Sequence, residues 1–262
     1  MTSFVAAQLP LRPFPHGTEQ PGELGDHIMG MNVLGWLTEH PVAVWGERWM
    51  RAGRLNVTFS RPMVAGQTLS VDVESHASFL NIRYDDADGR VCATGVATID
   101  STDRTHSFRD ENPTLERLTP DASSLDGALL SRMTFRFDAD RDLAFLDDRP
   151  DANDWQSRRW AHPAWLGTAT NAVIMRHIDF GDRERHPGRW LQVSTEVDVM
   201  RPIEDGAEID TFSRIRRVSR LGRDGRHQVA HLECTFWAGA QPAARVTNAF
   251  IFADASRVVP QP

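Results

Sequence analysis

Two stretches of the chain place apolar residues at helical spacing and leave almost no polar face. The less polar stretch spans residues 162–178, and its apolar side chains are Trp165, Leu166, Ala169, Val173 and Ile178. Pro163 suits the first turn of a helix, where its missing N–H is not needed, and the polar run 179–188 supplies the stop. Because a helix without a polar face belongs in the interior, we expect this helix to be buried.

The second apolar stretch lies near the N-terminus, at residues 27–38. Asp26 is placed to cap its start, and Pro41 is placed to end it. Its first residue, His27, lies 135 positions before His162, which begins the other stretch. We therefore expect a second buried helix, with the same place in an N-terminal half of the chain.

Strand patterns follow each expected helix. Residues 55–59, 69–74 and 133–137 alternate between apolar and polar side chains, which is typical of strands with one buried face. The remaining expected strands are 81–84, 91–99, 191–199, 209–218, 228–237 and 244–252. Asp-Gly pairs at 88–89 and 224–225 predict tight turns between neighbouring strands. Each half is thus expected to hold one helix and four or five antiparallel strands.

One short phrase occurs in both halves. Residues 61–66 read Arg-Pro-Met-Val-Ala-Gly, and residues 201–206 read Arg-Pro-Ile-Glu-Asp-Gly. Two copies in the same order relative to two buried helices indicate an internal duplication. The predicted fold class is α+β, a tandem in which each repeat is an antiparallel sheet wrapped around a central helix. The predicted N-terminal repeat covers residues 1–105, the linker 106–128 and the C-terminal repeat 129–262.

The composition restricts the classes of partner. The 262 residues carry a net charge of −7, which argues against nucleic acid. No apolar run approaches the length of about 18 residues that suggests a membrane span, and no signal-peptide pattern is present, so we expect a cytoplasmic protein without a membrane partner. All 29 basic residues are arginine, which excludes lysine Schiff-base chemistry. Cys92 and Cys234 lie in apolar strand segments without C-x-x-C spacing, and we expect them to be reduced and buried.

Two segments carry a resemblance to a known superfamily: residues 54–74 read RLNVTFSRPMVAGQTLSVDVE, and residues 161–174 read AHPAWLGTATNAVI. Over nearly its whole length the chain resembles a double hot-dog protein of the acyl-CoA thioesterase and MaoC-like hydratase superfamily. The resemblance implies an acyl thioester of coenzyme A or of an acyl carrier protein as ligand, with the acyl group between the two helices. It also implies that the thioester carbonyl meets a helix N-terminus, where free N–H groups and the helix dipole stabilise an oxyanion. Because hot-dog folds host hydrolases, hydratases, dehydratases and proteins that only bind, the reaction must be argued from the site.

Asp26 and His27, at the start of the first expected helix, are the candidate catalytic pair. Either side chain could activate a water against a thioester carbonyl held by the N–H groups of Met29 and Gly30. In the structural alternative, Asp26 only caps the helix and His27 is a surface residue of its first turn. Asn32, on the same helix, is a candidate for orienting the water, and its alternative is ordinary packing.

The second expected helix offers three candidate substrate-binding residues. His162 occupies its start, and Asn171 is a further polar residue able to line the pocket. Nine residues at about 100° each place these two on opposite helix faces, so we do not expect both to contact one substrate atom. Asn171 needs a partner in so apolar a helix, and a backbone carbonyl or a bound ligand would serve. We also assign Trp165, in the first turn, to the substrate-binding residues.

The main prediction is hydrolysis of the thioester by an activated water, and hydration of an enoyl thioester is the first alternative. MaoC-like hydratases carry an Asp-x-Asn-Pro-x-His phrase, whereas residues 151–156 read Asp-Ala-Asn-Asp-Trp-Gln. Gln156 stands where histidine would be and transfers no proton at neutral pH, so hydration ranks below hydrolysis. The second alternative is a non-catalytic acyl-CoA-binding protein. Coenzyme A enters only as part of the substrate, no metal or redox cofactor is expected, and both a monomer and a homo-oligomer fit.

Overall fold

The structure is a computed structural model that describes residues 2–5, 28–99, 117–146, 149–180, 191–222, 225 and 227–254. The N-terminal half holds β1 (Thr2–Val5), α1 (Gly30–Trp45), α2 (Glu47–Ala52), β2 (Gly53–Phe59), β3 (Thr68–Ser75), β4 (Phe79–Asp85) and β5 (Val91–Ile99). The C-terminal half holds α3 (Ala122–Leu125), β6 (Leu129–Arg136), α4 (Ala139–Asp142), the 3-10 helix η1 (Ala144–Leu146), α5 (Ala152–Arg158), α6 (Pro163–His177), β7 (Leu191–Val199), β8 (Glu208–Leu221), β9 (His227–Ala238) and β10 (Gln241–Asp254).

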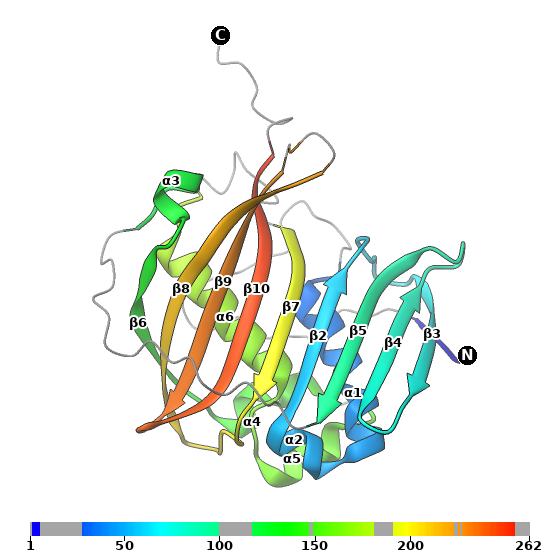
Figure 1. Cartoon of the computed structure of the whole chain (residues 1–262). Coiled ribbons are helices and arrows are strands. Elements are labelled where there is room, and N and C mark those ends of the chain that lie inside the picture. The colour runs from blue at the N-terminus through cyan, green and yellow to red at the C-terminus, as the bar shows by residue number, and fades with distance from the viewer. Residues whose placement is uncertain are drawn as a thin grey trace.

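The ten strands of the described residues form one antiparallel sheet in the order β1-β3-β4-β5-β2-β7-β10-β9-β8-β6 (Figure 1). Helices α1 and α6 pack against each other on one face of this sheet and lie behind it in Figure 1. Strands β2 and β7 join the two halves, with Val57 opposite Thr195 and Leu55 opposite Val197. The predicted α+β tandem, with an antiparallel sheet around central helices, is confirmed.

The two copies of the Arg-Pro turn make the same backbone hydrogen bonds. The N–H of Arg61 donates to Cys92 O at 3.2 Å, and the N–H of Arg201 donates to Ala243 O at 3.1 Å. Each turn ends five residues later on a glycine, with a φ of 82° in the first copy and 75° in the second, a region that favours glycine. Equivalent bonds at equivalent positions support the internal duplication.

The helix predicted at residues 162–178 is α6, with Pro163 at its first position as expected. The N-terminal helix begins three residues later than predicted, with Met29 in place of Asp26 at the N-cap position, and it continues past Pro41 for another turn. The predicted stop at Pro41 is therefore wrong. Proline removes only the one N–H that would bond four residues back, and burial of Pro41 and Val42 holds the helix together across that position. The helix ends at Gly46, whose φ is 54° and whose N–H donates to Val42 O at 2.7 Å.

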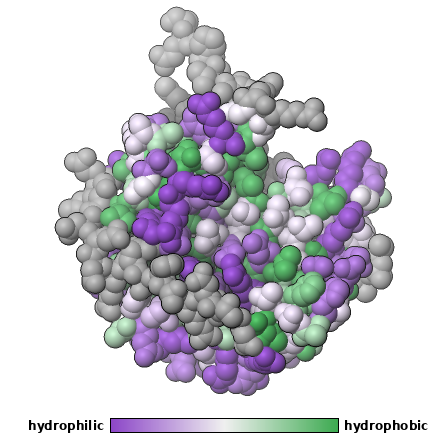
Figure 2. Space-filling model, in the orientation of Figure 1, coloured by the Kyte–Doolittle hydropathy of each residue, from purple (hydrophilic) through white to green (hydrophobic). Residues whose placement is uncertain are grey.

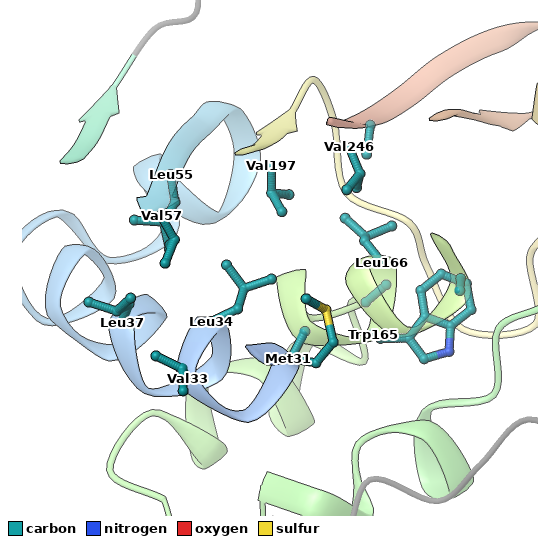
Figure 3. Close-up of a cluster of buried hydrophobic side chains, with 14 of the residues drawn as sticks. Met31, Val33, Leu34, Leu37, Leu55, Val57, Trp165, Leu166, Val197 and Val246 are labelled. Carbon is teal, nitrogen blue, oxygen red and sulfur yellow. The ribbon is translucent and has the colours of Figure 1, made fainter. Parts of the chain in front are cut away.

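The seam between α1 and α6 is filled by apolar side chains (Figure 3). Met31 and Leu34 of α1 meet Gly167 of α6, where an added Cβ atom would overlap Met31 Sδ and lie 3.2 Å from Leu34 Cδ2. The missing side chain at Gly167 is therefore what lets the two helices approach so closely. Val197 and Val246 of the sheet close the same cluster from the other side.

The outer face of the sheet, turned toward the viewer, carries many hydrophilic side chains (Figure 2). Arg54 of β2 pairs with Glu196 of β7 at 2.7 Å, and Arg245 of β10 pairs with Asp198 of β7 at 3.1 Å. Opposite charges on neighbouring strands stabilise their pairing, and the first of these pairs joins the two halves of the chain.

Both cysteines are free and buried, as predicted. Burial raises the pKa of Cys234 to about 12, so its thiol stays protonated and is a poor nucleophile at neutral pH. Within the described ranges, no helix is both long enough and apolar enough to cross a lipid bilayer.

Candidate active site

Four neutral polar side chains meet where β7 and β10 pass α6, on the sheet face turned toward the helices. Thr195 of β7 and Asn248 of β10 are cross-strand partners, and both are fully buried. The Thr195 hydroxyl donates a hydrogen bond of 2.8 Å to Asn248 Oδ1, and Gln192 Nε2 donates to the same oxygen at 3.2 Å and to the Thr195 hydroxyl. Asn248 Nδ2 donates to Asn171 Oδ1 of α6 at 3.4 Å. These four residues form what we call the polar cluster.

Helix α1 begins directly beside the polar cluster. A Cβ atom on Gly30 would overlap Gln192 Oε1 and lie 3.3 Å from the Phe59 ring, so only glycine leaves room for the Gln192 amide here. Met29, at the N-cap position, makes no side-chain capping bond, so its side chain does not occupy the first N–H groups of the helix. Met29 and Leu191 are 52% and 56% exposed, so solvent reaches this helix start. The positive end of α1 is therefore reached by solvent, and Gln192 of the polar cluster lies directly beside it.

The start of α6, by contrast, is closed. His162 is 0% exposed, and its Nδ1 accepts a hydrogen bond of 3.0 Å from the N–H of Ala164. The rings of Phe145 and Trp155 pack edge-on against its imidazole, at centroid distances of 5.5 and 4.8 Å. Burial lowers the pKa of His162. Because Nδ1 is held as an acceptor, the neutral ring carries its proton on Nε2, and the capping bond opposes a second proton.

A buried ionic network joins the C-terminal half of α1 to the start of α6. Arg149 forms an ion pair with Glu39 and donates to Gly35 O at 2.7 Å, while its Nε lies 3.4 Å from Asp151 Oδ1. Asp151 Oδ2 in turn lies 3.5 Å from His162 Nε2. Burial raises the pKa of Glu39 to about 7, although the neighbouring Arg149 guanidinium lowers it. The network therefore links the two helices, and Glu39 is the member whose pKa burial brings close to neutral pH.

His40 follows Glu39 on α1 and faces β4 of the sheet. Its Nε2 lies 3.0 Å from the hydroxyl of Tyr84 on β4. Burial lowers the pKa of His40 to about 4 and raises the pKa of Tyr84, so both side chains are neutral at pH 7.

The structure places two of the predicted substrate-binding residues at the open helix start, Gly30 and Asn171. Asn32 lies on the first turn of α1 and is fully buried, and neither of its side-chain polar atoms has a hydrogen-bond partner in the part of the chain that is described. A buried unsatisfied amide costs about 1–3 kcal/mol for each unpaired group, so Asn32 is suited to bind a polar ligand atom. Asp26 and His27 lie outside the described residues.

The other two predicted substrate-binding residues lie at the start of α6, His162 nine residues and Trp165 six residues before Asn171. His162 is held in its cap and in the ionic network. Trp165 is 3% exposed and packs edge-on against Phe137 at a centroid distance of 5.1 Å. Their assignment to the substrate stays a prediction, and the contacts that the structure gives them are with the core.

No protein-family model matches the sequence, and no curated protein matches it. Solved structures do match. A Mycobacterium tuberculosis protein described as having a double hotdog fold shares 13% identity over 88% of this chain and 83% of its own, with a TM-score of 0.56. The chain has the double hot-dog fold.

Two further proteins with similar structures carry names that refer to an activity. An acyl-CoA thioesterase II from Mycobacterium marinum shares 15% identity over 88% of this chain and 92% of its own, with a TM-score of 0.51. A Chloroflexus aurantiacus protein, named provisionally as a MaoC domain dehydratase, shares 8% identity over 87% of this chain and 82% of its own, with a TM-score of 0.55. At such low identity these likenesses establish the double hot-dog fold and leave the reaction to the site.

Three members of the polar cluster were missed by the sequence reasoning: Gln192, Thr195 and Asn248. In the double hot-dog sheet, strands that are distant in sequence become neighbours, so no local motif marks them. A signal was nevertheless present at Asn248, which lies between Val246 and Phe250 in an apolar strand where all three are fully buried. A polar residue at a buried strand position requires a partner elsewhere, and this requirement points to the other strand.

Proposed function

We propose that this chain is an acyl-thioester hydrolase that binds the thioester of coenzyme A or of an acyl carrier protein at the start of α1. One observation carries the proposal: the open N-terminus of α1, from the first repeat, adjoins a polar cluster built by the second repeat. Donors for a carbonyl oxygen thus lie next to groups that can orient a water. The acyl-CoA thioesterase among the similar structures supports this substrate class.

The start of α1 supplies the electrostatic part of the proposed mechanism. The thioester carbonyl accepts hydrogen bonds from the N–H groups of Gly30 and Met31, where the helix dipole is positive. When a nucleophile adds to the carbonyl carbon, the oxygen becomes negatively charged and these bonds strengthen. Donors aimed at a developing oxyanion lower the barrier by up to about 4 kcal/mol each.

The polar cluster supplies the water site. Amide side chains carry both donors and acceptors, so Gln192 and Asn248 can hold a water by its hydrogens and by its oxygen. The hydrogen bond from the Thr195 hydroxyl fixes Asn248 Oδ1 in place. The contact with Asn171 fixes the other end of the same amide. A water held in this way is oriented before the reaction begins.

The proton that the attacking water loses must go to a group outside the polar cluster, because asparagine, glutamine and threonine do not titrate near neutral pH. Asp26 and His27, which directly precede the described segment that begins at Ile28, are our candidates for this general base. The water oxygen bonds to the carbonyl carbon as its proton moves to the base. The carbon–sulfur bond then breaks, and the thiolate takes the proton back, giving a free acid and a thiol.

Pure protein mixed with a saturated acyl-CoA tests the proposal, with free thiol as the readout. We expect thiol release at a rate proportional to the concentration of protein, and loss of at least nine-tenths of it in an Asp26→Asn, His27→Ala double variant. If the pure protein releases no thiol from any acyl-CoA, the chain is not a thioester hydrolase of this class.

Hydration is the second candidate, and the distance of 3.5 Å between Asp151 and His162 is the observation that favours it. Asp151 supplies the carboxylate of the hydratase motif, and His162 supplies the imidazole that is missing from the motif because Gln156 stands in its place. Both residues are buried, however, and His162 is held in its capping bond. Crotonyl-CoA separates the reactions, since hydration removes the enoyl absorbance without releasing thiol. An acyl-CoA-binding protein without activity would be stabilised by both compounds and convert neither.

A further inference from the structure

The residue after Gly30 on α1 has its side chain in the buried core. Met31 is 1% exposed, and its side chain lies between α1 and α6 (Figure 3). Its Sδ and Cε occupy the space above Gly167, with Cε 3.3 Å from the position of a Cβ atom there. Met31 therefore fills the space in the seam that is left because Gly167 of α6 has no side chain.

This place is next to the polar cluster. Gly167 and Asn171 are four residues apart on α6, so they share one helix face and are separated by about 6 Å along the axis, slightly more than one turn. Met31 is likewise adjacent to Gly30 on α1. An acyl group whose carbonyl lies between Gly30 and Asn171 thus meets the Met31 side chain one turn farther along the seam.

Beyond Met31 the seam is already full. Leu34 lies 3.2 Å from the Cβ position at Gly167, and Leu166 and Trp165 of α6 are buried beside it. A long acyl chain could enter only if one of these side chains moved. Met31 is the first of these side chains that an acyl chain coming from Gly30 would meet.

We propose that Met31 forms the end of the acyl pocket and restricts the enzyme to short acyl groups. This proposal rests on the proposed function, because it takes the start of α1 as the place of the thioester. Truncating Met31 leaves an apolar space lined by Gly167 and Leu34, and a dry apolar cavity accepts an apolar ligand. The chain length of the preferred substrate should then increase.

The test compares Met31→Ala with the wild type on acetyl-, butanoyl-, octanoyl- and dodecanoyl-CoA. We expect the ratio of kcat/KM for octanoyl-CoA to that for acetyl-CoA to rise at least tenfold. Met50→Ala is the matched control, since Met50 is a methionine on α2 that is also 1% exposed, and it should leave the ratio unchanged. An unchanged ratio in folded Met31→Ala protein, or a wild type that prefers dodecanoyl-CoA, overturns the proposal. If Met31→Ala does not fold, Met31→Val tests the same direction with a smaller cavity.

A binding measurement separates this proposal from the proposed function. Ketone analogues, in which a methylene replaces the thioester sulfur of octanoyl-CoA or acetyl-CoA, bind without being hydrolysed. We expect the octanoyl analogue to raise the Tm of Met31→Ala more than that of the wild type, and the acetyl analogue to raise both equally. If these Tm shifts are seen but the protein releases no thiol, the proposed hydrolysis is wrong and the role of Met31 in the acyl pocket stands. If thiol is released but the octanoyl analogue raises the Tm of both proteins equally, only the role of Met31 is wrong.

Discussion

The hydroxyl of Thr195 is bonded at 2.8 Å to the side-chain oxygen of Asn248, its direct partner across β7 and β10. The same face of these strands otherwise carries buried valines, Val197 and Val246. A valine pair would fill this position without burying a polar group. In the proposed function this polar pair orients the water for a thioester bound at the start of α1.

Replacing Thr195 by valine removes the hydroxyl and keeps the shape of the side chain. We expect kcat for acyl-CoA hydrolysis to fall at least tenfold, because Asn248 loses the bond that fixes its amide. The free energy of unfolding should fall by about 1–3 kcal/mol, because the hydroxyl makes two hydrogen bonds, to Asn248 and from Gln192, each with a net value of about 0.5–1.5 kcal/mol. Thr235→Val is the control, since Thr235 is buried in the same sheet and its hydroxyl has no hydrogen-bond partner among the described residues. Full activity in Thr195→Val would show that the polar cluster does not hold the water.

Gly30→Ala tests the contact between α1 and the polar cluster. The added methyl group overlaps Gln192 Oε1, so the Gln192 amide must move, while alanine is the better helix former. We expect kcat/KM to fall at least tenfold with little change in Tm. In a Gln192→Ala background the same substitution should have no further effect, because the group that it displaces is already gone. Additive losses in the double variant would show that Gly30 acts without Gln192.

Asn32→Leu separates a binding role from a packing role. Removing a buried amide whose polar atoms are unpaired should raise the free energy of unfolding by about 1–3 kcal/mol. If Asn32 binds the substrate, as we expect, kcat/KM falls at the same time. Thr38→Val, which changes another buried polar side chain of α1, should keep full activity. A more stable and fully active Asn32→Leu protein would assign Asn32 to packing.

Glu39 and His40 should give opposite slopes of stability against pH. Burial raises the pKa of Glu39 to about 7, beside Arg149 and Asp151, so its stability contribution is complete below pH 4.5 and is lost as the pH rises through 7. Burial lowers the pKa of His40, which contacts Tyr84, to about 4, so its contribution is complete above pH 6.5 and is lost as the pH falls through 4. Between pH 4.5 and 6.5 the two slopes cancel in the wild type.

Single variants should uncover each slope in urea unfolding measured from pH 4.5 to 7.5. Glu39→Gln leaves the histidine, so the free energy of unfolding should rise with pH up to 6.5, by about 1 kcal/mol per pH unit. His40→Gln leaves the Glu39 carboxylate, so the free energy of unfolding should fall by a similar amount per pH unit as the pH rises toward 7. Parallel curves for both variants and the wild type would show that neither side chain titrates in this range.

The fold could be predicted from the sequence because its signals are local. Strands with one buried face alternate, and the repeated Arg-Pro turn marks equivalent positions in the two halves. The error at Pro41 also has a local cause, since proline often ends a helix, but burial of Val42 outweighs the single lost hydrogen bond. Packing of this kind depends on tertiary contacts and leaves no mark in the local pattern.

The candidate site could be predicted only in part. Asn171 stood out because it is a polar residue in an apolar helix, and Gly30 because its backbone N–H lies near the helix start that was expected at His27. The closed state of His162 could not be foreseen, because the rings of Phe145 and Trp155 that cover it come from a segment without a strong pattern. Two helix starts that look equivalent in sequence are therefore distinguished only by what packs on them.

A crystal structure with the ketone analogue of acetyl-CoA tests the site most directly. We expect the ketone oxygen within about 3.2 Å of the N–H of Gly30 or Met31, with the amide of Gln192 or Asn248 bonded to a water near the carbonyl carbon. An analogue bound with its ketone at the start of α6, beside His162, would contradict the assignment of the active site to α1.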